Sequence, residues 1–126
     1  MSLQHIAVIG AGTMGNGIAQ VCAVAGFDVT LVDISDTALE RGVATVRKNL
    51  ERQVNKQTID NDSAQAALQR ILTTTDYAQL DGAQLVIEAA TENLDLKLRL
   101  LKMIASHVGR DCVIASNTSS LSITEL

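Results

Sequence analysis

Short apolar runs alternate with longer helical segments along the 126 residues of the chain. The strongest runs are apolar at every position, which is typical of strands buried on both faces of a parallel sheet. We predict strands at His5–Ile9, Val29–Val32, Ile71–Thr75, Leu85–Ala89 and Cys112–Ala115. Because these strands alternate with helices, the pattern predicts an α/β fold with a doubly wound parallel sheet.

The first helical segment, Met14–Ala25, follows the first strand almost directly. Its apolar residues recur at helical spacing, so we expect one face to point into the core. That expected face consists of Ile18, Val21, Cys22 and Ala25.

The second helical segment is long, with a cap at Ser35 or Asp36 and an end near Lys56. Its apolar stripe recurs in steps of three or four residues and consists of Leu39, Val43, Val46, Leu50 and Val54. A shorter helix is predicted over Ser63–Arg70. The two helices together form a helical hairpin before the third strand. A further helix is predicted over Leu94–Val108.

Composition restricts the possible function. The chain is 47% apolar but only 2% aromatic, and its length fits one domain with an aliphatic core. A net charge of −4 and the scarcity of aromatic side chains argue against nucleic-acid binding, which needs cationic contacts to phosphate and stacking rings. We therefore expect no nucleic-acid partner.

The two cysteines, Cys22 and Cys112, stand alone without a CxxC pair or a neighbouring histidine. This spacing predicts inert reduced thiols and no metal site. No stretch reaches the roughly 18 apolar residues of a membrane span, and the start lacks the pattern of a signal peptide. We expect a cytoplasmic protein without a membrane partner.

The glycines concentrate the candidate chemistry at one place. Gly10-Ala11-Gly12-Thr13-Met14-Gly15 matches GxGxxG, lies directly after a predicted strand and opens a predicted helix. In such a turn the first glycine bends the chain, the second admits a pyrophosphate and the third allows close packing of helix on strand. The helix N-terminus also favours phosphate. We predict a dinucleotide site at residues 10–15.

Asp33 follows the second strand, eighteen residues after Gly15. At this position a carboxylate accepts hydrogen bonds from the ribose hydroxyls of the adenosine half. It would repel the 2′-phosphate of NADP, and the neighbouring Ile34 offers no compensating cation. The sequence therefore predicts NAD as the cofactor.

Four strings, VIGAGTMGNGIAQ, LVDIS, LVIEAATENLDLK and IASNTSSLSIT, carry a resemblance over nearly the whole chain. With them the sequence resembles the 3-hydroxyacyl-CoA dehydrogenase family, in its 3-hydroxybutyryl-CoA branch. The resemblance implies a Rossmann-type NAD-binding domain with the helical hairpin between strands two and three. It also implies an oxidoreductase of fatty acid β-oxidation that interconverts (S)-3-hydroxyacyl-CoA and 3-oxoacyl-CoA by hydride transfer.

The same resemblance suggests roles for residues beyond the glycines. Glu92 and Lys97 match positions that contact the nicotinamide half of NAD, and Ser119 matches the serine beside the cofactor that bonds the substrate oxygen. Glu92 and Ser119 follow predicted strand ends, where open α/β sheets bind ligands. The residues alone also fit ordinary turns, in which Ser, Thr and Asn side chains bond their own backbone.

A coenzyme A contact is implied on the long helix. Lys48, Arg52 and Lys56 share one helical face, and Lys56 matches the coenzyme A contact of the family. Asn49 stands where some relatives have a serine that touches coenzyme A. The other interpretation is a solvated surface balanced by nearby glutamates.

The family's general base is a histidine in a strand beyond the ASNTSS string, assisted by a later glutamate, and its dimer forms through a helical C-terminal domain. None of these is encoded here, and the pattern of Leu121–Leu126 predicts the start of another helix. We therefore expect residues 1–126 to be a truncated domain that lacks its last strand and binds NAD without turnover. The full-length protein would be a homodimer.

Two other functions fit the residues. One is a β-hydroxyacid dehydrogenase that acts on a free acid, and the other is a non-catalytic NAD-binding or sensor module, for which the absent base is no defect.

Overall fold

The computed structural model describes residues 3–90, 94–109 and 112–116. Within them the elements are β1 (His5–Ile9), α1 (Thr13–Val24), β2 (Asp28–Val32), α2 (Asp36–Asn55), α3 (Asn61–Arg70), β3 (Ile71–Thr74), the 3-10 helix η1 (Tyr77–Leu80), β4 (Leu85–Glu88), α4 (Leu94–His107) and β5 (Val113–Ser116). All five predicted strands are confirmed, with ends that differ by one residue at most.

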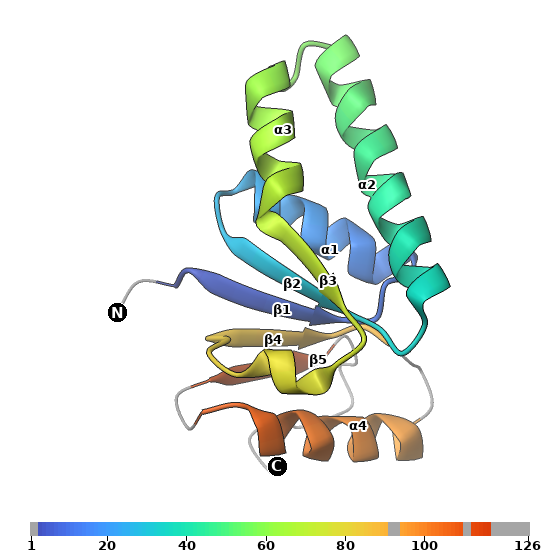
Figure 1. The fold of residues 1–126 in the computed structure, drawn as a ribbon, viewed down its shortest axis with the longest axis vertical. Coiled ribbons are helices and arrows are strands. Elements are labelled where there is room, and N and C mark those ends of the chain that lie inside the picture. The colour runs from blue at the N-terminus through green and yellow to red at the C-terminus, as the bar shows by residue number, and fades with distance from the viewer. Residues whose placement is uncertain (1–2, 91–93, 110–111, 117–126) are drawn as a thin grey trace.

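The strands form one parallel sheet in the order β3-β2-β1-β4-β5 (Figure 1). Ile9 at the end of β1 pairs with Val32 on one side and with Glu88 on the other, and Glu88 pairs with Ser116. The carboxyl ends of β2, β1, β4 and β5 therefore lie side by side. This register brings the segments that follow these strands to one edge of the sheet.

Helices cover both faces, and each face has its own apolar core. α1, α2 and α3 pack on one face, over side chains such as Val8 and Leu31. α4 and η1 pack on the other, over Ile9 and Val86 (Figure 1). The predicted doubly wound α/β class is confirmed, and so is the hairpin of α2 and α3 between β2 and β3.

The predicted buried face of α1 is wrong at Val21 and Ala25, while Ile18 and Cys22 do pack against the core. Val21 is 68% exposed and Ala25 is exposed, while Ile18 and Cys22 are only partly buried. The side chains that face the core are smaller or polar: Gly15, Asn16, Ala19, Gln20 and Ala23. α1 therefore packs a face of small and polar side chains against the sheet.

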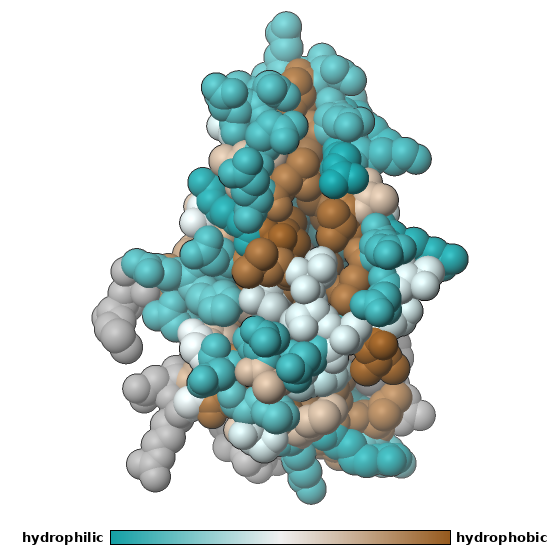
Figure 2. Space-filling model, in the orientation of Figure 1, coloured by the Kyte–Doolittle hydropathy of each residue, from teal (hydrophilic) through white to brown (hydrophobic). Residues whose placement is uncertain are grey.

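The hairpin follows its predicted pattern more closely. Leu39, Val46 and Leu50 are buried, and the Ser35 hydroxyl caps α2 by accepting from the Ala38 amide at 3.1 Å. Figure 2 shows apolar side chains gathered between α2 and α3, with hydrophilic ones on the outer sides.

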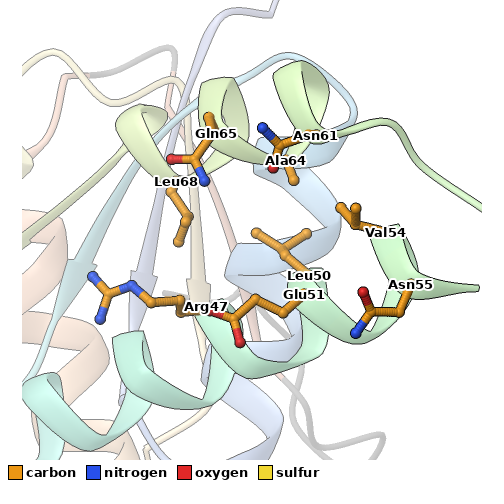
Figure 3. A pocket seen from close by; sticks show the side chains of 9 residues that line it. All are labelled: Arg47, Leu50, Glu51, Val54, Asn55, Asn61, Ala64, Gln65 and Leu68. Atoms are coloured by element: carbon orange, nitrogen blue, oxygen red, sulfur yellow. The ribbon is translucent and has the colours of Figure 1, made fainter. Parts of the chain in front are cut away.

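A cavity of about 340 Å³ opens between these two helices, lined by side chains of both, Leu50 and Leu68 among them (Figure 3). It contains none of the predicted cofactor residues.

No helix in the described ranges has both the length and the apolar character that crossing a bilayer requires. The helix predicted from Leu121 lies outside the described residues.

Candidate functional site

The glycine turn is clamped between two strand ends. The Gly10 amide donates to the Val32 carbonyl at 2.7 Å, and the Ala89 amide donates to the Ile9 carbonyl at 2.8 Å. Gly10 has a φ of +101°, and a methyl group on its Cα would lie 2.7 Å from the Cα of Ala90. Only glycine fits this position without displacing the segment after β4.

The third glycine sets the approach of α1 to the turn. A methyl group at Gly15 would overlap the carbonyl oxygen of Gly10. By contrast, a methyl group at Gly12 would have nothing within 4 Å. Gly12 is the N-cap of α1, and the first turn of this helix contains no acidic residue. The turn thus presents open space beside the positive end of a helix dipole, which suits a pyrophosphate.

Asp33 is held against this turn. Its Oδ2 accepts a hydrogen bond from the Ala11 amide at 2.9 Å, and its Oδ1 accepts from the Ser35 amide at 3.0 Å. The carboxylate is partly buried directly after β2. Asp33 and the glycine turn, which were predicted from separate parts of the sequence, are therefore brought together.

A cavity of about 450 Å³ begins at Asp33 and Gly10 and extends over α4. Much of its lining is apolar, and Ile34, Leu96 and Met103 expose 82%, 49% and 40% of their surface. Arg99 and Tyr77 add polar groups. A flat apolar ring of the size of a purine would cover the exposed side chains while its sugar lay beside Asp33.

Tyr77 keeps its proton in this cavity. Burial raises the pKa of its phenol, and the negative charges of Asp33 and Glu88 raise it further. The side chain is therefore a neutral hydroxyl at physiological pH.

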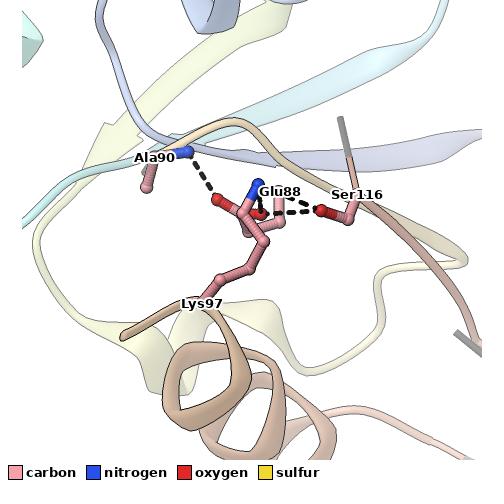
Figure 4. A network of polar contacts seen from close by, with 4 residues as sticks. All are labelled: Glu88, Ala90, Lys97 and Ser116. Carbon is pink, nitrogen blue, oxygen red and sulfur yellow. Dashed lines mark hydrogen bonds and ion pairs between the residues drawn. The ribbon is translucent and has the colours of Figure 1, made fainter. Parts of the chain in front are cut away.

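Lys97 lies at the other end of the site and is only 1% exposed. Its Nζ is 3.0 Å from Oε1 of Glu88, which is fully buried, and it donates to the Ser116 hydroxyl at 3.3 Å (Figure 4). Ser116 in turn donates to Oε1 of Glu88 at 2.9 Å, and the Ala90 amide donates to Oε2 at 2.6 Å. Buried charges require such compensation by partners.

Sequence reasoning missed Glu88 and Ser116. A signal was present: Glu88 ends an otherwise apolar strand, and Lys97 follows Leu94 by three residues and precedes Leu101 by four, a spacing that puts it among the apolar residues of one helical face. An acid and a base at two core positions suggest an ion pair. Glu92 and Ser119 themselves lie outside the described residues.

The residues predicted to contact coenzyme A lie along the hairpin, away from the strand ends. Asn49 is partly buried, and its side-chain amide donates to Oε1 of Gln20 in α1 at 3.2 Å. Lys48, Arg52 and Lys56 are exposed, and Lys56 is the C-cap of α2. The 20 residues of α2 place Lys56 about 30 Å from the start of the helix. Their role stays a prediction.

Both cysteines are free in the structure, and burial raises the pKa of each thiol. This agrees with the expectation of unreactive thiols.

The comparisons with known proteins agree on one family. The family described as 3-hydroxyacyl-CoA dehydrogenase, NAD binding domain, matches residues 5–126. A 3-hydroxybutyryl-CoA dehydrogenase of Bradyrhizobium diazoefficiens is 42% identical over 124 residues, which are 98% of this chain and 42% of the relative. A 3-hydroxyadipyl-CoA dehydrogenase of Escherichia coli is 39% identical over all of this chain and 26% of its own length.

Solved structures show the same likeness. The crystal structure of (S)-3-hydroxybutyryl-CoA dehydrogenase from Ralstonia eutropha superposes with a TM-score of 0.93 and 52% identity, over 99% of this chain and 44% of that one. The chain thus spans less than half the length of these three relatives. It belongs to the family of NAD-binding domains of 3-hydroxyacyl-CoA dehydrogenases, and NAD is its cofactor.

Proposed function

We propose that this chain is the cofactor-binding part of an oxidoreductase that interconverts (S)-3-hydroxyacyl-CoA and 3-oxoacyl-CoA, with 3-hydroxybutyryl-CoA as its substrate. The observation that carries the proposal is the hydrogen bond between Asp33 and the Ala11 amide, which joins a ribose-binding carboxylate to a phosphate-binding turn. The names of the relatives support the reaction and the acyl group. A free β-hydroxy acid remains an alternative substrate. An activity assay of the whole protein distinguishes it from the acyl-CoA.

Each part of the site has a task toward the cofactor. Asp33 accepts hydrogen bonds from the adenosine ribose, while Gly12 and the N-terminus of α1 hold the pyrophosphate. Glu92 and Lys97 contact the nicotinamide half, and Ser119 bonds the substrate oxygen. NAD supplies the chemistry when bound, because its nicotinamide accepts or donates the hydride.

The chain's own residues bind and orient. The two histidines of residues 1–126, His5 and His107, both precede the ASNTSS string, beyond which the family's general base is expected. The Nε2 atom of His5 is bonded to the Thr30 hydroxyl at 2.8 Å, and His107 ends α4. A positioned base contributes about 10²- to 10⁴-fold to such a reaction. We propose that residues 1–126 bind NAD without turnover.

The family resemblance also suggests where the whole protein works and how it assembles. We propose a cytoplasmic enzyme of fatty acid β-oxidation that forms a homodimer through a helical C-terminal domain. Coenzyme A would reach the positive face of α2 at Lys56.

Titration of NADH tests the cofactor assignment directly. The chain contains no tryptophan, so nicotinamide fluorescence can be followed without indole emission. We expect saturable binding at micromolar or higher concentrations, and about tenfold weaker binding of NADPH, because its 2′-phosphate meets Asp33. Asp33→Arg should reverse the preference. Absence of saturation, or equal affinity for both cofactors, would overturn the assignment.

The reaction is tested with the whole gene product. We expect it to oxidise NADH in the presence of acetoacetyl-CoA and not in the presence of acetoacetate. Reduction of the free acid alone would identify a β-hydroxyacid dehydrogenase, and binding without either reaction would identify a sensor module.

A further inference from the structure

Glu88 lies where three parts of the chain meet. It ends β4, and its carboxylate is bonded to Lys97 of α4 and to Ser116 of β5 (Figure 4). The same carboxylate accepts from the Ala90 amide, two residues beyond the strand. Glu88 thus bonds the strand end, the helix and the neighbouring strand at the ligand-binding edge of the sheet.

In the sequence, these bonded residues flank the segments that carry the remaining predicted site residues. The segment 89–93, with Glu92, runs from Glu88 to the start of α4, and Lys97 lies in the first turn of that helix. The segment with Ser119 begins directly after Ser116. The described residues next to both segments, Ala90 and Ser116, are therefore bonded to the single carboxylate of Glu88.

The location of these charges suggests more than stability. Replacing a buried ion pair by apolar side chains is often neutral or stabilising, so a core of this kind does not need the pair. The pair lies at the carboxyl end of the strands, where open sheets bind their ligands. It also fixes the ammonium of Lys97, a residue assigned to the nicotinamide half, within 3.0 Å of its carboxylate partner.

We propose that Glu88 is a positioning residue for the nicotinamide half of the cofactor. It acts through Lys97 and Ser116 and makes no contact with the adenosine half. The proposal rests on the proposed cofactor site and adds a residue to it. A purely structural role would affect both halves of the cofactor alike.

The test compares two ligands that differ only in the nicotinamide. NADH affinity is measured by fluorescence and ADP-ribose affinity by calorimetry, for the wild-type chain and for Glu88→Gln and Ser116→Ala. We expect each substitution to weaken NADH binding about tenfold, as the loss of one charge-assisted hydrogen bond implies. The affinity for ADP-ribose should change less than twofold. Equal losses for both ligands, or no loss for either, would overturn the proposal.

Further variants distinguish a selective effect on NADH binding from a general loss of folding. Glu88→Gln leaves the Lys97 ammonium buried without its carboxylate, so the double variant Glu88→Gln, Lys97→Met removes both charges. Because Glu88 acts through Lys97, the double variant should lose little more NADH affinity than Lys97→Met alone, and fully additive losses would contradict the proposal. Ile104→Val, in the core beneath α4 and outside the cavity lining, is the control and should leave the ratio unchanged.

The wild-type chain separates this proposal from the proposed function. If it binds neither ligand, the cofactor site itself is wrong. If it binds both, and Asp33→Arg weakens both while the Glu88 and Ser116 variants show no selectivity, only the positioning role fails.

Discussion

The carboxylate of Asp33 and the backbone amide of Ala11 form a 2.9 Å hydrogen bond across the ends of two neighbouring strands. The second oxygen of Asp33 is bonded to Ser35, the N-cap of α2. One side chain therefore fixes both the glycine turn and the start of the long helix. Such preorganisation lowers the entropic cost of binding.

Removing this carboxylate should affect folding and binding together. We expect Asp33→Ala to lower the free energy of unfolding by about 1–3 kcal/mol, because the two amides lose a charged acceptor. NADH affinity should also fall. Asp33→Asn is the matched control, since its amide oxygen can still accept from Ala11. Urea denaturation measures the first effect, and an Asp33→Ala protein as stable as the wild type would contradict it.

Substitutions at the glycines of the turn should differ in whether they affect stability or NADH binding. Gly15→Ala should destabilise the fold by about 3 kcal/mol, because the added methyl overlaps the Gly10 carbonyl. Gly12→Ala should leave the free energy of unfolding within about 0.5 kcal/mol of wild type but weaken NADH, since its methyl enters open space beside the helix terminus. Urea denaturation and NADH titration of both variants check this.

Gly17 offers a control within the same helix. A methyl group there meets nothing within 4 Å, and alanine favours the helix, so Gly17→Ala should raise stability by up to about 1 kcal/mol. A loss of stability in Gly17→Ala equal to that in Gly15→Ala would show that α1 tolerates no substitution and that the overlap at Gly15 is not the cause.

The Ser35 cap should contribute measurably to the hairpin. Ser35→Ala removes the acceptor of the Ala38 amide and should lower the free energy of unfolding by about 1 kcal/mol. Thr37→Ala, at an exposed position in the first turn, is the control and should have little effect. Thermal unfolding followed by circular dichroism compares the two, and equal transitions would exclude the cap as a source of stability.

The raised pKa values of two thiols and one phenol predict that the protein loses stability at alkaline pH. Burial raises the pKa of Cys22, Cys112 and Tyr77 in the folded chain, so the folded state favours their protonated forms. Their contribution is present below the unfolded pKa values, near 8.5 for cysteine and 10 for tyrosine, and is lost as the pH rises through the folded values. We expect the free energy of unfolding to decline above about pH 9.

Thiol labelling gives a second measure of the same shift. At pH 7 to 8, iodoacetamide should react with the folded chain more slowly than with the urea-unfolded chain, because less thiolate is present. The single variants Cys22→Ser and Cys112→Ser assign the two rates. Folded rates equal to the unfolded ones would contradict a raised pKa.

Periodicity predicted the sheet and the hairpin because both depend on long, regular apolar patterns. It failed on α1, where the contact with the sheet is set by size. The overlap that a methyl at Gly15 would cause shows how close the helix lies to the turn, and only small residues such as Ala19 and Ala23 fit along that side. The larger Val21 is left outside. Hydrophobicity alone does not carry this information.

The candidate site was predictable as far as its residues act locally. The glycine turn and Asp33 follow strand ends, and their spacing indicates their task. The spacing of residues after strand ends did not identify Glu88, because a buried carboxylate is tolerated only when partners from other elements compensate it. Those partners, Lys97 and Ser116, are 9 and 28 residues away in sequence and meet it only in the folded sheet.

The strand order also bears on how cofactor preference can evolve. The glycine turn and Asp33 come from the first half of the chain, around β1 and β2, and the polar network of Glu88, Lys97 and Ser116 comes from β4, α4 and β5. Mutations that alter the proposed ribose contact can therefore accumulate at Asp33 and its neighbours without changing the network around Glu88. The contact of Gly10 with Ala90 joins the two halves, so we expect that position to be the least free to vary among descendants of this sequence.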